Sequence, residues 1–330
     1  MRRRLAVAVT ALAALTPVSN AQSPQPAVLS ASVQWSIPDE SFGGWSGIEV
    51  DDDGVGFTTV SDRGFVTSGR LVRSASDRLI GAEGGPILTL QESEGGPLRR
   101  YRDDSEGLAV APDGTMYVSF EGTHRVMRFA DITGDAGEDL PGHPDFDEMQ
   151  NNSSLEALAI GPDGTLYTLP ERSGQLARPF PVYRFRDGAW DQPFDIPRRD
   201  EFLPVGADIG PDGRFYLLER LLSTTNPGFA SRVRRFDLTD EGLTNETQLL
   251  VTQPRQHDNL EGIAVWRDQD RQIRLVLIAD NNQRFFQKNE IVEYIVTPDA
   301  LILQPESRPD TDPDAGTGGN DTLDPEDETL

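Results

Sequence analysis

The sequence predicts an all-β fold, a β-propeller of five blades in which each blade has four strands. The main observation is a block that recurs along the 330-residue chain and has the pattern of a β-hairpin. In its clearest copy, residues 106–121, a short apolar strand is followed by Pro112-Asp113-Gly114 and by a strand rich in aromatic and β-branched residues. Pro-Asp-Gly favours a tight turn because Pro fixes φ and Gly accepts a positive φ.

Four further copies give the period of the repeat. Equivalent positions fall at 46, 106, 156, 205 and 261, which are 60, 50, 49 and 56 residues apart. A period near 50 residues built from short strands is typical of propeller blades, whereas helical repeats show a 3.6-residue pattern that these segments lack. We therefore expect five blades. Six blades are the alternative, because the first unit is long enough to include one without the recurring block.

The N-terminus precedes the propeller. Three arginines at positions 2–4 are followed by an apolar stretch over residues 5–18 and by small residues at 19–21. This pattern predicts a secretory signal peptide over residues 1–21 and a secreted or periplasmic protein. Residues 22–27 are expected to form a linker before the propeller domain.

The propeller domain is expected over residues 28–304. A strand over 28–37 should pair with the last unit, because a circular propeller must join its first and last blades. Residues 131–150 lack a pattern and are expected to form a surface loop, and residues 305–330 a disordered acidic tail. The strands expected besides the hairpins are 70–76, 87–91, 125–129, 182–185, 194–196, 232–238, 248–252, 290–296 and 300–303.

The composition limits the classes of function. The chain has no cysteine, so an exported protein of this sequence has neither disulfides nor a lipoprotein anchor. Its net charge of −25 repels nucleic acid and anionic membranes, so we expect no nucleic-acid partner and no membrane insertion after signal removal. The same charge attracts cations, although solubility alone is the alternative explanation. We expect a monomer.

Carboxylates at equivalent repeat positions are the candidate metal ligands. Glu106, Glu156 and Glu261 occupy the same place in three innermost strands, which line the channel of a propeller. Glu49 and Asp208 replace the alanine found three residues further on in the other copies, and we expect them in a neighbouring layer. Such oxygen ligands suit Ca²⁺ rather than zinc. The alternative is that each carboxylate accepts hydrogen bonds from backbone N–H groups of the neighbouring blade.

Polar residues at the exits of the second strands form a second candidate set. Arg63, Arg172 and Arg220 are candidate catalytic residues, because arginine binds carboxylate or phosphate with two parallel hydrogen bonds. His257, shortly before Glu261, is a candidate base. Salt bridges between blades are the alternative role for the arginines. The candidate substrate-binding residues are Asp62, Glu171, Glu219, Asp280, Asn281 and Arg284.

Together the segments 46–54 with 61–64, 105–109 and 260–264 resemble the phytase-like family, described as "esterase-like activity of phytase". The resemblance extends over about residues 28–300 and implies an exported propeller that hydrolyses phosphate or other esters. The chain departs from the calcium-dependent propeller phytases, because its single lysine, Lys288, cannot make a lysine-rich phosphate cradle.

Two classes of function follow. The first is an ester hydrolase, or a lactonase-like variant, in which Ca²⁺ polarises an oxygen of a small-molecule ester or anionic ligand and positions water. The second is a non-catalytic propeller that binds a ligand or a partner at the channel mouth. Both would use converging carboxylates, so the sequence leaves both open.

Overall fold

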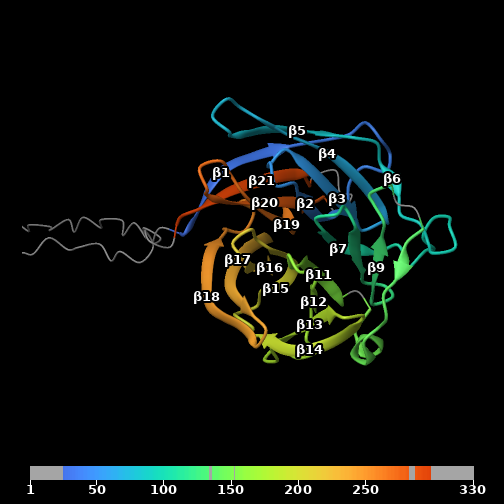
Figure 1. Ribbon diagram of the computed structural model, residues 1–330. Coiled ribbons are helices and arrows are strands. Elements are labelled where there is room, and N and C mark those ends of the chain that lie inside the picture. The colour runs from blue at the N-terminus through green and yellow to red at the C-terminus, as the bar shows by residue number, and fades with distance from the viewer. Residues whose placement is uncertain (1–24, 134–135, 152, 282–286, 299–330) are drawn as a thin grey trace, which may run out of the picture. The chain divides into compact units, whose positions relative to one another are not determined.

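Five antiparallel sheets surround one axis in the computed structural model, which describes residues 25–133, 136–151, 153–281 and 287–298 (Figure 1). The innermost strands follow one another around a closed ring, so that the last blade packs beside the first. This arrangement confirms the predicted all-β propeller, with five blades. The expected signal peptide, residues 22–24 of the linker and the acidic tail lie outside the described residues, and Ala27 at the end of the linker already begins a strand.

The strands of each blade lie side by side from the channel outward. Blade 1 contains β2 (Trp45–Val50), β3 (Gly56–Ser61), β4 (Phe65–Arg73) and β5 (Leu79–Gly84), and the short β6 (Leu88–Thr89) pairs with β4. Blade 2 contains β7 (Ser105–Val110), β8 (Met116–Phe120), β9 (Arg125–Phe129) and β10 (Glu138–Asp139). Blade 3 contains β11 (Leu155–Ile160), β12 (Leu166–Pro170), β13 (Phe180–Arg186) and β14 (Ala189–Ile196).

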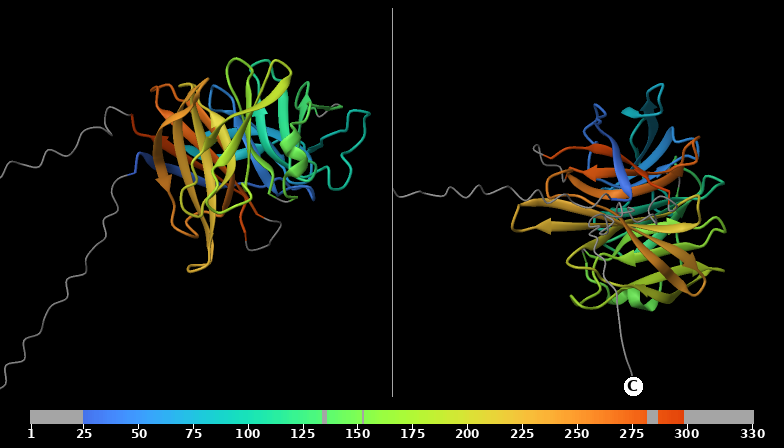
Figure 2. Two further views of the ribbon diagram at one scale, coloured as in Figure 1. Left: turned by 90° about the horizontal axis from the view of Figure 1, so that it is seen from below. Right: turned by 90° about the vertical axis from the view of Figure 1, so that its left-hand side faces the viewer.

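Blades 4 and 5 complete the ring. Blade 4 contains β15 (Leu203–Ile209), β16 (Arg214–Ser223), β17 (Gly228–Thr239) and β18 (Gly242–Val251). Blade 5 contains β19 (Asn259–Arg267), β20 (Ile273–Asp280), β21 (Glu290–Val296) and the N-terminal β1 (Ala27–Gln34). The β16–β17 hairpin is longer than its counterparts and extends beyond the body of the propeller (Figure 2).

The N-terminal strand closes the ring, as the sequence predicts. β1 pairs antiparallel with β21 and is the outermost strand of blade 5. Its expected range of 28–37 is too long, because the strand ends at Gln34 and Trp35 packs instead on Trp45, with ring centroids 5.5 Å apart. The strand expected over 300–303 lies outside the described residues.

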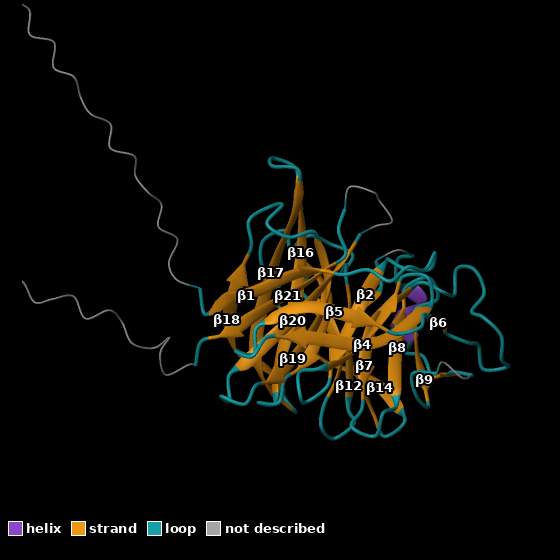
Figure 3. Cartoon of the chain, turned by 90° about the horizontal axis from the view of Figure 1, so that it is seen from above, coloured by secondary structure: helices purple, strands orange, loops and turns teal. Residues whose placement is uncertain are grey.

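Two other expectations need correction. The fourth strand of blade 1 is β5, whereas the expected strand over 87–91 is reduced to the two residues of β6. The expected loop over 131–150 contains β10 and the 3₁₀-helix η1 (Pro144–Glu148), the purple element in Figure 3. Proline at the start of η1 suits a first turn, where its missing N–H would have no partner. Among the described residues, no helix is long and apolar enough to cross a membrane.

The hairpin turns define one end of the channel. The Gly114 N–H donates to the Ala111 carbonyl oxygen at 2.9 Å, and Gly114 has a φ of 88°, as the predicted turn requires. The Asp113 carboxylate accepts the Thr115 N–H at 3.0 Å and fixes the turn. We call this end, where the innermost strands finish, the turn mouth.

Apolar side chains of the innermost strands close the channel in its middle. Ile48, Leu108, Leu158 and Ile263 line a central cavity of only about 10 Å³. This volume is about the space that a single water requires. The two mouths of the channel are therefore separate sites.

Candidate active site

A β-bulge occurs at the same repeat position in all five innermost strands. The bulged residues are Ser46, Glu106 with Gly107, Glu156, Val205 and Glu261. A bulge interrupts the ladder and turns a side chain away from the regular alternation, and bulges are common beside active sites. The three equivalent glutamates found in the sequence thus share a backbone irregularity as well as a repeat position.

Glycines after the bulges explain the recurring Glu-Gly sequence. A Cβ at Gly47 would lie 2.9 Å from the Glu106 carbonyl oxygen, and one at Gly107 would lie 2.8 Å from the Glu156 carbonyl oxygen. At Gly262, a Cβ would lie 2.8 Å from the Ser46 carbonyl oxygen of the first blade. These approaches are too close for a side chain. Glycine therefore allows these bulges to pack directly on the next blade, whereas blade 3 has Ala157 at the equivalent position.

The bulged residues form a first ring around the channel. A second ring of side chains follows the second strand of each blade. The ladders pair Ser61, Phe120, Pro170, Glu219 and Ala279 with the residue just before each bulge. The residues that come next in the chain are therefore structurally equivalent. They are Asp62, Glu121, Glu171, Arg220 and Asp280.

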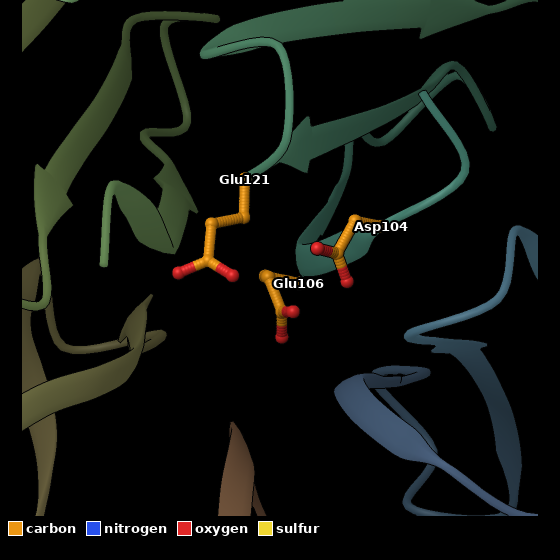
Figure 4. A group of neighbouring side chains, drawn as sticks. All are labelled: Asp104, Glu106 and Glu121. Carbon is orange, nitrogen blue, oxygen red and sulfur yellow. The ribbon is translucent and has the colours of Figure 1, made fainter. Parts of the chain in front are cut away.

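Glu106 of the first ring and Glu121 of the second ring lie together with Asp104 in a dense group of carboxylates, shown in Figure 4. Oxygens of Asp104, Glu106 and Glu121 all lie within 4.8 Å of one another. Glu156 borders the group on the blade 3 side, next to Glu121. We call this end of the channel, where the innermost strands begin, the carboxylate mouth.

Burial and mutual repulsion raise the pKa values at the carboxylate mouth. Burial followed by the charges of Glu156 and Glu261 holds the pKa of Glu106 well above its usual range, and burial with neighbouring carboxylates does the same for Glu156. Burial and the charge of Asp104 raise the pKa of Glu121 to about 7. Burial and the charge of Glu261 also raise the pKa of Asp62 to about 7. The group thus has more negative charge than its surroundings neutralise.

Arg220 places a cation in this acidic ring. Its guanidinium donates to Glu171 Oε1 at 3.0 Å, to Asn259 Oδ1 at 3.1 Å and to Glu261. Burial lowers the pKa of Arg220, but the charges of Glu261, Glu156 and Glu171 outweigh burial and raise it. Burial also raises the pKa of Glu261 to about 7, and Arg220 limits that rise. Arg220 lies at the base of the long β16–β17 hairpin, so the blade 4 extension stands beside the mouth (Figure 2).

Glu49 and Asp208 lie at the other end of the channel, not in a layer just beneath the three glutamates. They line a cavity of about 550 Å³ at the turn mouth. Glu49 and Asp208 come three residues after the bulges of their strands, which corresponds to about 10 Å along a strand. The apolar side chains in the middle of the channel separate them from the glutamates at the bulges. The Asp208 carboxylate accepts the Val265 N–H at 2.6 Å and so bridges to the next blade.

Comparison with protein families identifies the chain. The family model named phytase-like, described as esterase-like activity of phytase, matches residues 40–283. The chain belongs to the phytase-like family. This confirms the resemblance found in the sequence. Comparison with curated protein sequences gives no match.

Solved structures similar to this phytase-like chain share little sequence with it. The PQQ-bound aldose sugar dehydrogenase from Streptomyces coelicolor has a TM-score of 0.44 and 14% identity, over 82% of this chain and 99% of that one. Virginiamycin B lyase from Staphylococcus aureus has a TM-score of 0.40 and 14% identity, over 82% and 76%. A gluconolactonase from Xanthomonas campestris has a TM-score of 0.41 and 18% identity, over 76% and 72%.

The other arginines expected at the site have different surroundings. Arg63 donates to the carbonyl oxygens of Ser41 and Gly43 at 2.7 and 3.1 Å, and its Nε lies 3.8 Å from Asp62. It therefore braces the segment before β2. Arg172 is about half exposed, with Nε 3.3 Å from Glu171 Oε2.

Glu219 is not equivalent to Glu171 and does not join the ring. Its side chain is fully buried and accepts hydrogen bonds from Arg232 at 2.7 Å and from Arg234 at 2.7 and 2.8 Å. The sequence has Glu-Arg at both 171–172 and 219–220, which suggested that Glu219 is equivalent to Glu171. The strand pairing shows instead that Arg220, one residue later, is equivalent to Glu171. Glu219 instead belongs to an ion-pair network inside blade 4.

Three of the remaining predicted residues lie in or next to blade 5. His257 is buried, with Nε2 2.8 Å from the Tyr294 hydroxyl and Nδ1 3.6 Å from Glu290, so its contacts are with β21. Asp280 takes its place in the second ring, and Asn281 Oδ1 accepts the Gly44 N–H at 3.3 Å. Arg284 lies outside the described residues.

Three site residues are missing from the sequence-based set: Asp104, Glu121 and Asn259. Glu121 closes the clearest hairpin block, and its equivalence to Glu171 is visible in the sequence at the same distance from Glu106 and Glu156. Asp104 and Asn259 lie two residues before a bulge, where the other blades have Gly44, Ser154 and Leu203. Their side chains join the site only through the bend of the bulge, which the sequence pattern does not reveal.

Proposed function

We propose that this chain is an exported hydrolase of phosphate or other esters that acts at the carboxylate mouth with the help of Ca²⁺. The observation that supports it most directly is the group of buried carboxylates around Arg220. The family description, esterase-like activity of phytase, agrees with a hydrolytic role. The N-terminal pattern of arginines, apolar residues and small residues supports export.

The residues at this mouth fit a calcium ion. Asp104, Glu106 and Glu121 offer three carboxylate oxygens within 4.8 Å of one another. Oxygen ligands lie 2.3–2.6 Å from Ca²⁺, so two ligands of one ion are at most about 5 Å apart. Burial and the charges of neighbouring carboxylates raise the pKa values of these groups, so a bound cation would be favourable there. Glu156 adjoins this set, whereas Glu261 is engaged by Arg220.

When bound, a divalent cation supplies a Lewis acid that polarises an ester oxygen. In this proposal Arg220 stabilises the negative charge that develops on the substrate. A cation held in place in a site with little water does this effectively. Glu171, Asn259 and Glu261 hold its guanidinium in place. Because these partners come from blades 3 and 5, the catalytic arrangement depends on the closed ring.

The test is hydrolysis of a panel of carboxylic and phosphate esters, measured with Ca²⁺ and with a chelator, together with the metal content of the purified protein. We expect calcium-dependent turnover that falls at least 100-fold in Arg220→Met, since an electrostatic stabiliser contributes that much. Glu241→Gln, in an exposed turn, is the matched control. Turnover that is unaffected by both the chelator and Arg220→Met would refute the proposal.

A further inference from the structure

A second cavity lies on blade 3, outside the channel but beside the carboxylate mouth. It has a volume of about 230 Å³ and forms where η1 approaches the loop between β12 and β13. Arg172 and Arg178 line it together with Tyr183, Asp145 and Glu148. Because η1 belongs to the segment before blade 3, this cavity is a local addition to the repeat.

One peptide unit connects this cavity with the carboxylate mouth. Glu171 turns toward the channel, where its Oε1 accepts a hydrogen bond from Arg220 at 3.0 Å. The next residue, Arg172, lines the cavity, and its Nε stays 3.3 Å from Glu171 Oε2. A ligand in the cavity therefore lies within reach of a substrate group at the mouth.

Two arginines, Arg172 and Arg178, line the cavity in a chain whose net charge is −25, and Arg198 is a further arginine near Arg172. Arg198 lies over the Phe180 ring at 4.8 Å, and the charge of Arg172, added to burial, lowers the pKa of Arg198. Within the described part of the chain, no carboxylate oxygen lies within 4.0 Å of the Arg178 or Arg198 guanidinium. Arg172 is paired with Glu171, whereas Arg178 has no carboxylate at ion-pair distance among the described residues, which favours binding of an anion there.

Two carboxylates, Asp145 and Glu148, also line the cavity. Asp145 accepts a hydrogen bond from the Tyr183 hydroxyl at 3.1 Å, and Glu148 is exposed. The loop that presents Arg178 is braced, because Ser173 Oγ donates to the Arg178 carbonyl oxygen at 2.7 Å. The Arg178 guanidinium is therefore left available on a fixed backbone.

We propose that this cavity is a specificity subsite for an oxyanion, a carboxylate or phosphate that the substrate carries in addition to its scissile ester. The inference rests on the proposed function, because it assigns the substrate class of the same site. Arg178 and Arg172 bind the oxyanion with paired N–H donors, as arginine does with planar and tetrahedral anions. Arg172 is thereby a specificity residue rather than a catalytic one.

The first test is independent of catalysis. Binding of inorganic phosphate to the full chain is measured by titration calorimetry in the presence of a chelator. We expect Arg178→Ala to weaken binding at least tenfold, as loss of a charge-assisted hydrogen bond does, and Arg178→Lys to recover part of it. Arg186→Ala removes an exposed blade 3 arginine as the control and should bind like the wild type. No binding by the wild type, or equal binding by Arg178→Ala, would overturn the assignment.

The second test uses two esters with the same leaving group, p-nitrophenyl butyrate and p-nitrophenyl hydrogen succinate. In Arg178→Ala we expect kcat/KM to fall at least tenfold for the anionic ester, through KM, and to be unchanged for the neutral one. Equal effects on both esters would show that Arg178 has no specificity role. If the wild type hydrolyses neither ester, these substrates give no support to the proposed function, while the phosphate titration still decides whether the cavity binds anions.

Discussion

Replacing Glu106 by glutamine should distinguish a metal ligand from a structural carboxylate. Glu106 is only 9% exposed, and oxygens of Asp104 and Glu121 lie within 4.8 Å of its own. At this separation and an effective dielectric constant near 20, two unit charges repel by about 3 kcal/mol. Protonation of one group relieves part of this repulsion. Glutamine keeps the size of the side chain and removes its charge, so metal-free Glu106→Gln should be at least as stable as the wild type at pH 8.

Calcium should affect the two proteins differently. At a free concentration of about 100 times Kd, a ligand that binds only the folded state adds about 2.7 kcal/mol to the free energy of unfolding. For a domain of this size, that corresponds to a rise in Tm of about 5 °C. We expect this rise in the wild type and in the control Glu241→Gln, and its near loss in Glu106→Gln. The measurement is thermal unfolding with Ca²⁺ and with a chelator.

The opposite result would refute this reasoning. If Glu106 only braces the bulge through buried hydrogen bonds, calcium leaves the wild-type Tm unchanged. Metal-free Glu106→Gln would then lose about 1–3 kcal/mol of stability. The carboxylate mouth would in that case be a structural device of the propeller.

The remaining predictions concern stability. In a chelator, Tm should fall as the pH rises from about 5 to 8. The pKa of Glu261 is about 7 in the folded state and about 4.3 in the unfolded state, so the folded state binds more protons in this pH window. A rise of Tm with pH in calorimetry would contradict this prediction. Glu219→Gln should cost about 3–5 kcal/mol in denaturant unfolding, because buried Arg232 and Arg234 lose the buried carboxylate that they share and keep only the more exposed Asp200 and Glu246. A cost near zero would show that the network is dispensable. Deleting residues 22–37 should expose the edge of β21 and cause aggregation in light scattering, whereas a soluble monomer would show that β1 is not needed for closure.

The fold was predictable because its signals are local. Pro112-Asp113-Gly114 determines a turn through its own backbone preferences, and the strand residues around it repeat at a period that is typical of propeller blades. The closing role of the N-terminal strand follows from the circular architecture. β5 was missed because its residues, which include Gly81 and Gly84, lack the composition of a strand and pair with β4 only through their place at the blade edge.

The candidate site was only partly predictable. The sequence by itself determined that Glu106, Glu156 and Glu261 occupy one repeat position, because equivalence along a repeat needs no coordinates. The tertiary structure decided which residues join them. A bulge in each innermost strand resets the alternation of side chains, so that a shift of one residue puts Arg220 in the ring and Glu219 in a buried network.

The position along the strand was likewise decided by the structure. Repeat alignment assigns residues to layers but does not give the length of the channel or the place where it closes. Glu49 and Asp208 lie about 10 Å along their strands from the bulges, beyond the apolar residues that fill the channel. The sequence thus determined the propeller and its equivalent carboxylates. The packing of apolar side chains in the channel and the register at each bulge decided that these carboxylates form two separate sites.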